Sequence, residues 1–309
     1  TSAALASGMV PLATGSDGGG SIRIPSALTG MSGLKPSQGR VPGGPAPMGA
    51  SDLSTVGPMA RRIRDVAAAL DVVIGPAPGD LRSLDRPIGS WRAALDDPPA
   101  PTRVLWAPSI EGQAPDPEIE SVCRAAVDRI AAAGVEVVET GPVFTDVIGP
   151  FALLFYGGLL PEYRAYLDDD DQAARITPGL AEILRNAVDL VSPESVEDAR
   201  KAAQAMSMAL AETMEGFDAI LSPTVAGQTP VSERQGTIDG EETVSWVSYT
   251  YPFNVTRRPA GTTPAGFTDD GMPVGLQIVG HQLDDLVVLQ TTAWIEDLLR
   301  LDPVAPDPA

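Results

Sequence analysis

The sequence is poor in the side chains that build disulfides, metal clusters and histidine-based active sites. It contains one cysteine, Cys123, and one histidine, His281, among 309 residues. A single cysteine cannot form an intramolecular disulfide, which favours a reducing, cytoplasmic setting, and one histidine with one cysteine provides no ligand cluster for a metal. The acidic run at 168–171 is interpreted as a solvated surface. We therefore expect no bound metal.

Basic side chains are also scarce. The chain has 21 lysines and arginines against 41 aspartates and glutamates, a net charge of −20. Nucleic-acid phosphates and anionic membrane surfaces repel such a protein, so neither is expected as a partner. No run of 18 or more apolar residues occurs. The apolar stretch at 151–160 is too short to cross a bilayer and is predicted to be a buried helix.

Helical and strand-like patterns alternate along the chain. One helix is expected to begin after Asp116 and end at Gly134, and a second to begin after Ser192 and end at Gly216, because each has a capping residue, a proline in the first turn and a glycine stop. Strands are predicted at 9–13, 103–107, 135–138, 218–224 and 275–280. This alternation indicates a layered α/β sheet.

The stretch GSDGGGSIRIP at 15–25 places three consecutive glycines before a serine, Ser21. Consecutive backbone N–H groups in such a turn can converge on an anion, either a phosphate or the oxyanion of an acyl-transfer intermediate. The spaced glycines and lysine of a phosphate-binding P-loop are absent. Two interpretations stay open on the pattern alone: a flexible turn, or a loop that presents Ser21 as a nucleophile.

A longer match favours the second interpretation. The segment PLATGSDGGGSIRIPSALTGMSGLKPSQGRVP at 11–42 resembles the signature region of the amidase signature family of serine hydrolases. The resemblance continues in order through 53–76, FDAILSPT at 217–224, YPFNVTRRPAGTTPAGF at 251–267 and DGMPVGLQIVG at 270–280. One position departs from it: Arg257 stands where the family usually has glycine, so the resemblance does not fix the shape of that loop.

The resemblance implies an α/β/α fold with a mixed central sheet covered by helices and no cofactor. It also implies that the N-terminal third of the family's domain precedes Thr1, so the chain would be the last two-thirds of a single domain. Within it we expect a signature core at 1–80, a variable substrate-selecting region at 81–215, a C-terminal sheet and helix at 216–300, and a tail at 301–309 whose end, PVAPDPA, is predicted to be disordered. Loss of the upstream third would expose apolar surface and make the chain poorly soluble.

The resemblance also assigns roles to individual residues. Ser21 matches the nucleophile that forms the acyl-enzyme. The backbone N–H groups that match its oxyanion hole are those of Gly18, Gly19, Gly20 and Ser21. Asp17 and Arg23 match a charged pair that holds this loop, and a supporting salt bridge is the simplest interpretation of them. Residues 245–253 could line an acyl pocket or could be core.

In the family, the proton acceptor is a lysine that acts through a second serine. Both matching segments would fall before Thr1. The two lysines present are not expected to replace that base, because Lys35 matches a structural turn and Lys201 lies on an amphipathic helix with a solvated face. His281 follows the last predicted strand and is interpreted as a surface residue rather than a base.

Three functions therefore stay open. The first is an amidase that hydrolyses a small-molecule carboxamide through an acyl-enzyme on Ser21 and releases ammonia or an amine. The second is the glutaminase subunit of a tRNA-dependent amidotransferase. The third is an inactive fragment that lacks the catalytic lysine and its relay serine. The sequence identifies neither the amide substrate nor the oligomeric state, and a homodimer is compatible with it.

Overall fold

The computed structural model describes residues 1–43 and 52–301, so the predicted disordered end at 303–309 lies outside the described residues. The strands are β1 (Leu12–Asp17), β2 (Ser32–Lys35), β3 (Thr55–Ala60), β4 (Arg103–Trp106), β5 (Glu136–Glu139), β6 (Ala219–Pro223), β7 (Thr237–Ile238), β8 (Glu241–Glu242), β9 (Ala260–Phe267) and β10 (Pro273–Val279). The helices are α1 (Ser2–Ala6), α2 (Arg23–Leu28), α3 (Ile63–Val73), α4 (Pro117–Ala132), α5 (Ile148–Leu167), α6 (Asp170–Ala173), α7 (Pro178–Val188), α8 (Pro193–Thr213), α9 (Pro252–Val255) and α10 (Asp285–Leu299), with short 3-10 turns at Ala93–Leu95 and Val244–Val247.

One large mixed sheet forms the centre of the molecule, as expected. Its eight strands follow the order β1-β3-β2-β9-β10-β6-β4-β5, and β7 pairs with β8 in a separate hairpin. Along the sheet from β1 as far as β6, each strand is antiparallel to the next one. Beyond β6 the strands are parallel, because β4 runs parallel to both β6 and β5. The strands of the signature region and those of the C-terminal region thus meet in one sheet.

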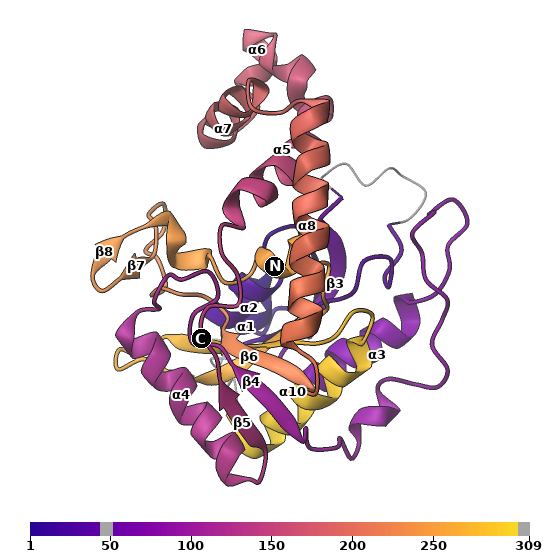
Figure 1. The fold of residues 1–309 in the computed structure, drawn as a ribbon, viewed down its shortest axis with the longest axis vertical. Helices are drawn as coiled ribbons and strands as arrows, with labels where there is room; N and C mark the ends of the chain where they lie inside the picture. The colour runs from indigo at the N-terminus through magenta and orange to yellow at the C-terminus, as the bar shows by residue number, and fades with distance from the viewer. Residues whose placement is uncertain (44–51, 302–309) are drawn as a thin grey trace.

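Side chains that alternate along the strands build two cores, one on each face of the sheet. In β4, Val104 and Trp106 belong to the core formed with α3, α4 and α10, whereas Leu105 belongs to the core on the opposite face. Alternate residues of a strand point to opposite faces, so a strand buried on both sides is apolar throughout. Figure 1 shows α3, α4 and α10 beside the sheet. The helix-covered α/β fold predicted from the sequence is therefore confirmed.

The two helices with clear capping signals form where they were predicted. The Asp116 side chain accepts a hydrogen bond from the Glu118 backbone N–H at the start of α4. At the start of α8, Ser192 and Ser195 each accept from the other's backbone N–H, which closes a capping box. These bonds satisfy N–H groups that have no partner inside the helix.

The first predicted strand was misplaced. The apolar run at 9–13 suggested it, but β1 spans Leu12–Asp17 and Met9 is 77% exposed. Its position follows from antiparallel pairing with β3, in which Leu12 lies opposite Ala60 and Asp17 opposite Thr55. The strand therefore ends at Asp17, directly before the glycine run.

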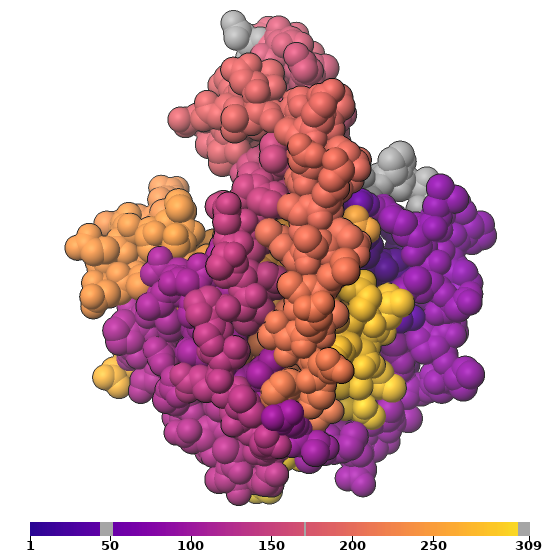
Figure 2. Space-filling model, in the orientation of Figure 1, coloured from indigo at the N-terminus to yellow at the C-terminus, as the bar shows by residue number. Residues whose placement is uncertain are grey.

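The stretch at 151–160 is helical, but the prediction that it is buried was wrong. Only Leu159 and Leu160 of α5 are buried, and the rest of its residues are half-buried or exposed. The outer part of α5 packs with α7 in a small apolar cluster of its own. Figures 1 and 2 show α6 and α7 at the far ends of α5 and α8, projecting away from the sheet. The first part of α5 packs against the core through Phe151, Leu154 and Phe155, whereas its outer turns lie beyond that core and have too few neighbours to bury all their sides.

No helix in residues 1–43 and 52–301 is long and apolar enough to cross a membrane.

Candidate active site

The glycine run forms the connection between the end of β1 at Asp17 and the start of α2 at Arg23. Gly20 has a φ of 135°, a conformation that side chains with a Cβ rarely adopt. A Cβ added there would lie 2.3 Å from Thr250 Oγ1 and 2.5 Å from Ile24 Cδ1. Position 20 therefore requires glycine for both backbone conformation and space, and the turn is a shaped loop rather than a flexible one.

The backbone N–H groups of four consecutive residues in this loop donate to no described residue. They are those of Gly18, Gly19, Gly20 and Ser21, of which Gly18 and Gly20 are buried, Gly19 is half-buried and Ser21 is exposed. Buried N–H groups are nearly always paired, and consecutive N–H groups in a tight turn can bind an anion, so this loop is a candidate site for an anionic ligand. Ser21 itself is exposed, and its hydroxyl forms no hydrogen bond to a described residue.

A buried ion pair holds the two ends of the loop together. Arg23 Nε donates to Asp17 Oδ2 over 3.0 Å, and Nη2 donates to Oδ1 over 2.9 Å, with both side chains fully buried. The Ile22 N–H also donates to Asp17 Oδ2, over 3.3 Å. Burial alone would raise the pKa of the Asp17 carboxyl, but the Arg23 guanidinium, with help from Lys35 and Asn254, lowers that pKa to about 2.

Three residues from distant segments complete the contacts of Arg23. Its guanidinium donates to Thr250 O over 2.8 Å, to Gln277 Oε1 over 2.8 Å and to Asn254 Oδ1 over 2.6 Å. Thr250 Oγ1 in turn donates to Gly19 O over 2.6 Å, which ties the loop to residues 250–255. The sequence alone assigned no role to Asn254 or Gln277. Asn254 lies in the YPFNVT segment and Gln277 in the GLQIVG segment, and both segments carry the family resemblance.

Aromatic rings pack against one side of the loop. The Phe151 ring stacks on Phe155 with centroids 5.3 Å apart and on Tyr251 with centroids 4.8 Å apart. A Cβ added to Gly18 would lie 2.8 Å from the Phe155 ring, and one added to Gly19 would lie 2.9 Å from the Phe151 ring. The absence of side chains at 18 and 19 lets these rings approach the unpaired amides.

The lysines and the histidine do not contact Ser21 through any hydrogen bond among the described residues. Lys201 is exposed and pairs with Asp198, as expected of a solvated helix face. His281 Nε2 lies 2.8 Å from Phe217 O and is half-buried. Lys35 lies at the end of β2 rather than in a turn and is 1% exposed, and its ammonium donates to Pro36 O. Burial, followed by repulsion from Arg23, lowers the pKa of Lys35 to about 7.

Other sequence-based expectations have simple outcomes. The thiol of Cys123 is buried, and burial raises its pKa. No group of three or more metal-ligating side chains occurs in the described ranges. Arg257, at the position where the resemblance has glycine, has a φ of 57°, so the loop keeps the left-handed conformation that glycine favours.

The fold is that of a known class of hydrolases. The sequence pattern of the Amidase family matches residues 1–289. The chain therefore belongs to the amidase signature family.

Two relatives illustrate the similarity. The chain is 34% identical to an acylamidase of Rhodococcus erythropolis over 304 residues, which covers 96% of this chain and 63% of the relative. It is 31% identical to a 6-aminohexanoate-cyclic-dimer hydrolase of a Pseudomonas strain, covering 96% of this chain and 65% of that protein.

Solved structures agree with the fold. A bacterial aryl acylamidase of the amidase signature family superposes with a TM-score of 0.87 at 26% identity, covering 100% of this chain and 67% of that one. A 6-aminohexanoate cyclic dimer hydrolase complexed with substrate superposes with a TM-score of 0.85 at 27% identity, covering 99% and 68%. This chain thus spans about two-thirds of the length of its relatives.

Proposed function

We propose that the protein containing this chain is an amidase that hydrolyses a carboxamide through an acyl-enzyme on Ser21. The observation that carries the proposal is the exposed Ser21 hydroxyl at the end of a run of backbone N–H groups without acceptors. Nucleophile and oxyanion donors must flank the same carbonyl, and this loop offers both from consecutive residues.

The proposed reaction has two steps. Ser21 Oγ gives its proton to the base and attacks the carboxamide carbon, and the carbonyl oxygen takes the negative charge beside the amides of residues 18–21. The C–N bond then breaks as the nitrogen takes up that proton and leaves as ammonia or an amine. Water next gives a proton to the base and attacks the ester carbon, and the C–Oγ bond breaks as Oγ takes up this proton, which releases a carboxylate and regenerates Ser21. Asp17 and Arg23 take no part in proton transfer and hold the loop in this conformation.

The proton acceptor for Ser21 is not assigned to a lysine of this chain. A lysine base must be neutral and within hydrogen-bond reach of the proton that it removes, directly or through one relay group. Lys35 has a suitably lowered pKa, but among the described residues its Nζ donates a hydrogen bond to Pro36 O and not to Ser21. Lys201 lies on the surface and forms an ion pair with Asp198. We infer that the base and its relay come from sequence outside these 309 residues, as the family resemblance implies, and that this chain alone is nearly inactive.

The surroundings of the loop favour an apolar acyl group over glutamine. The rings of Phe151, Phe155 and Tyr251 line the side of the loop at Gly18 and Gly19. A glutaminase must instead bind a charged α-amino acid. Glutamyl-tRNA(Gln) amidotransferase subunits are nevertheless among the relatives, one of them 31% identical, so glutamine is the second substrate to test.

Steady-state hydrolysis by the complete gene product tests the proposal. Release of ammonia from benzamide, hexanamide and glutamine is compared for the wild type, Ser21→Ala and His281→Ala. We expect benzamide or hexanamide to be hydrolysed faster than glutamine. Ser21→Ala should lose about 10⁴-fold or more in kcat, because a nucleophile and its partners act as a unit, and His281→Ala should keep full activity. Activity that survives in Ser21→Ala and disappears in His281→Ala would refute the assignment.

A further inference from the structure

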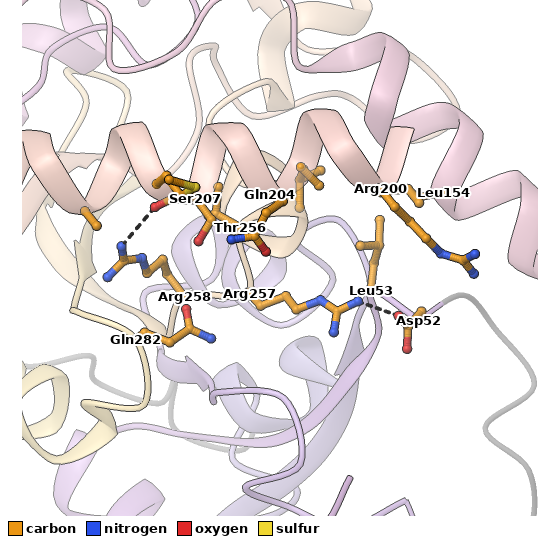
Figure 3. Close-up of a pocket in the computed structure, with 14 residues that line it drawn as sticks. Asp52, Leu53, Leu154, Arg200, Gln204, Ser207, Thr256, Arg257, Arg258 and Gln282 are labelled. Atoms are coloured by element: carbon orange, nitrogen blue, oxygen red, sulfur yellow. Dashed lines mark hydrogen bonds and ion pairs between the residues drawn. The ribbon is translucent and has the colours of Figure 1, made fainter. Parts of the chain in front are cut away.

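A cavity lies apart from the glycine loop. It has a volume of about 600 Å³ and opens between α8, the segment before β3 and the residues that follow α9. None of its lining residues belongs to the 17–23 loop. Figure 3 shows the side chains that line it, with Arg200 and Gln204 on the helix and Arg257, Arg258 and Gln282 opposite. Three arginines thus line one pocket in a chain with a net charge of −20.

Arg258 is the buried cation of this pocket, and among the described residues it forms no ion pair. The residue is 3% exposed, its Nε has no hydrogen-bond partner, and Nη2 donates only to Ser207 O over a long 3.4 Å. No carboxylate in the described ranges forms an ion pair with it. Arg23, equally buried, donates five hydrogen bonds, two of them to a carboxylate. A buried guanidinium without a counter-charge is unfavourable unless an anion completes it.

Arg257 is held in the pocket wall at an energetic cost. Its φ of 57° is a left-handed conformation that disfavours any residue with a Cβ. Its side chain forms an ion pair with Asp52, which also pairs with Arg82, so the single carboxylate of the pocket is already engaged by two arginines. Backbone strain of this kind is concentrated at functional sites.

The rest of the wall combines neutral polar side chains, among them Gln204 and Gln282, with an apolar part. Leu53, Leu154 and Val255 line the cavity beside the polar groups. A ligand that fits must therefore carry a negative charge for Arg258 and an apolar body for these side chains. The volume is that of a small-molecule site.

We propose that this pocket binds an organic anion, a carboxylate or a phosphate on an apolar body, with its charged group on the Arg258 guanidinium. Guanidinium groups bind both oxyanions through paired N–H donors. Arg257 and Arg200 also line the pocket, and each forms an ion pair with a carboxylate, Arg257 with Asp52 and Arg200 with Glu197. The site is separate from Ser21, and the proposal does not depend on amidase activity.

Thermal unfolding of the complete gene product tests this site. The melting temperature of its Ser21→Ala form, which cannot turn over amides, is measured with benzoate, with phenyl phosphate and with neutral benzyl alcohol. At ten times its Kd, an anion that binds the folded state is expected to raise Tm by about 1–2 °C. Benzyl alcohol should give a much smaller increase. Whichever anion protects more identifies the preferred headgroup.

Two variants and a control make the result specific. Arg258→Met removes the buried charge, so it should abolish the protection without lowering Tm in the absence of anion, whereas Lys201→Met, an exposed cation on the same helix as Arg200, should change neither. Arg257→Gly removes the strain of a left-handed φ and should raise Tm slightly. The same change should weaken the binding of the anion several-fold. Protection that survives Arg258→Met would place the anion elsewhere, for example beside Ser21. That result, equal protection by benzyl alcohol, or no protection by either anion, would overturn the proposal.

Discussion

Replacement of Arg23 by methionine tests whether the buried ion pair holds the glycine loop. The change removes five hydrogen bonds, to Asp17, Thr250 O, Asn254 and Gln277, and leaves the Asp17 carboxylate buried without its cation. Removal of one partner of a buried ion pair costs about 3–5 kcal/mol. Since the stability of whole domains is about 5–15 kcal/mol, the variant should lose a large part of its free energy of unfolding.

The assay is the equilibrium unfolding of the complete gene product in urea at pH 7, monitored by circular dichroism. Arg92→Met is the matched control, because Arg92 pairs with Asp96 on the surface, where such pairs contribute less than about 1 kcal/mol. Without Arg23, burial should raise the pKa of Asp17 above its unfolded value, so the destabilisation should be larger at pH 7 than at pH 4. Equal, small losses for both variants would refute the structural role of the pair.

Three further changes test other parts of the site. Gly20→Ala should destabilise the protein by about 2 kcal/mol or more in the same urea assay, because of the φ of Gly20 and the contact with Thr250. The loss should be clearly larger than that of Gly141→Ala, where no positive φ is required and an added Cβ contacts nothing within 4 Å. Equal losses would contradict the shaped loop. Folding lowers the pKa of Lys35 from 10.5 to about 7, so the unfolded state binds more protons than the folded state between these values. The free energy of unfolding of the wild type, relative to that of Lys35→Met, should therefore rise between pH 7 and 9.5. A difference that does not change with pH would mean that Lys35 stays charged when the protein is folded. Phe155→Ala in the complete gene product should raise KM for benzamide about tenfold without a matching loss for glutamine, whereas equal effects would remove the ring from the acyl site.

The sequence predicted those elements whose signals are local. The helices α4 and α8 begin at Asp116 and Ser192 because side chains within three residues satisfy their first N–H groups. The strand β1 was misplaced because its limits depend on pairing with β3, some 40 residues away. The burial of α5 was also mispredicted, since an apolar composition does not reveal how many neighbours a projecting helix has.

The site shows the same division. The order Asp17, glycine run, Ser21 and Arg23 is contiguous, so residue pattern and family resemblance suffice to propose it. The partners of Arg23 at Thr250, Asn254 and Gln277 are more than 220 residues away. Gln277 reaches Arg23 from β10, and Thr250 and Asn254 reach it from the segment around α9, so only the tertiary fold brings them together.

The most direct measurement of the central claim is the mass of the peptide that contains Ser21 after the complete gene product is treated with a fluorophosphonate. We expect one phosphonyl adduct on Ser21, none in Ser21→Ala, and only trace labelling of the 309-residue chain alone. An adduct on another residue, or a wild-type peptide that stays unmodified while the protein hydrolyses amides, would contradict the role of Ser21 as the nucleophile.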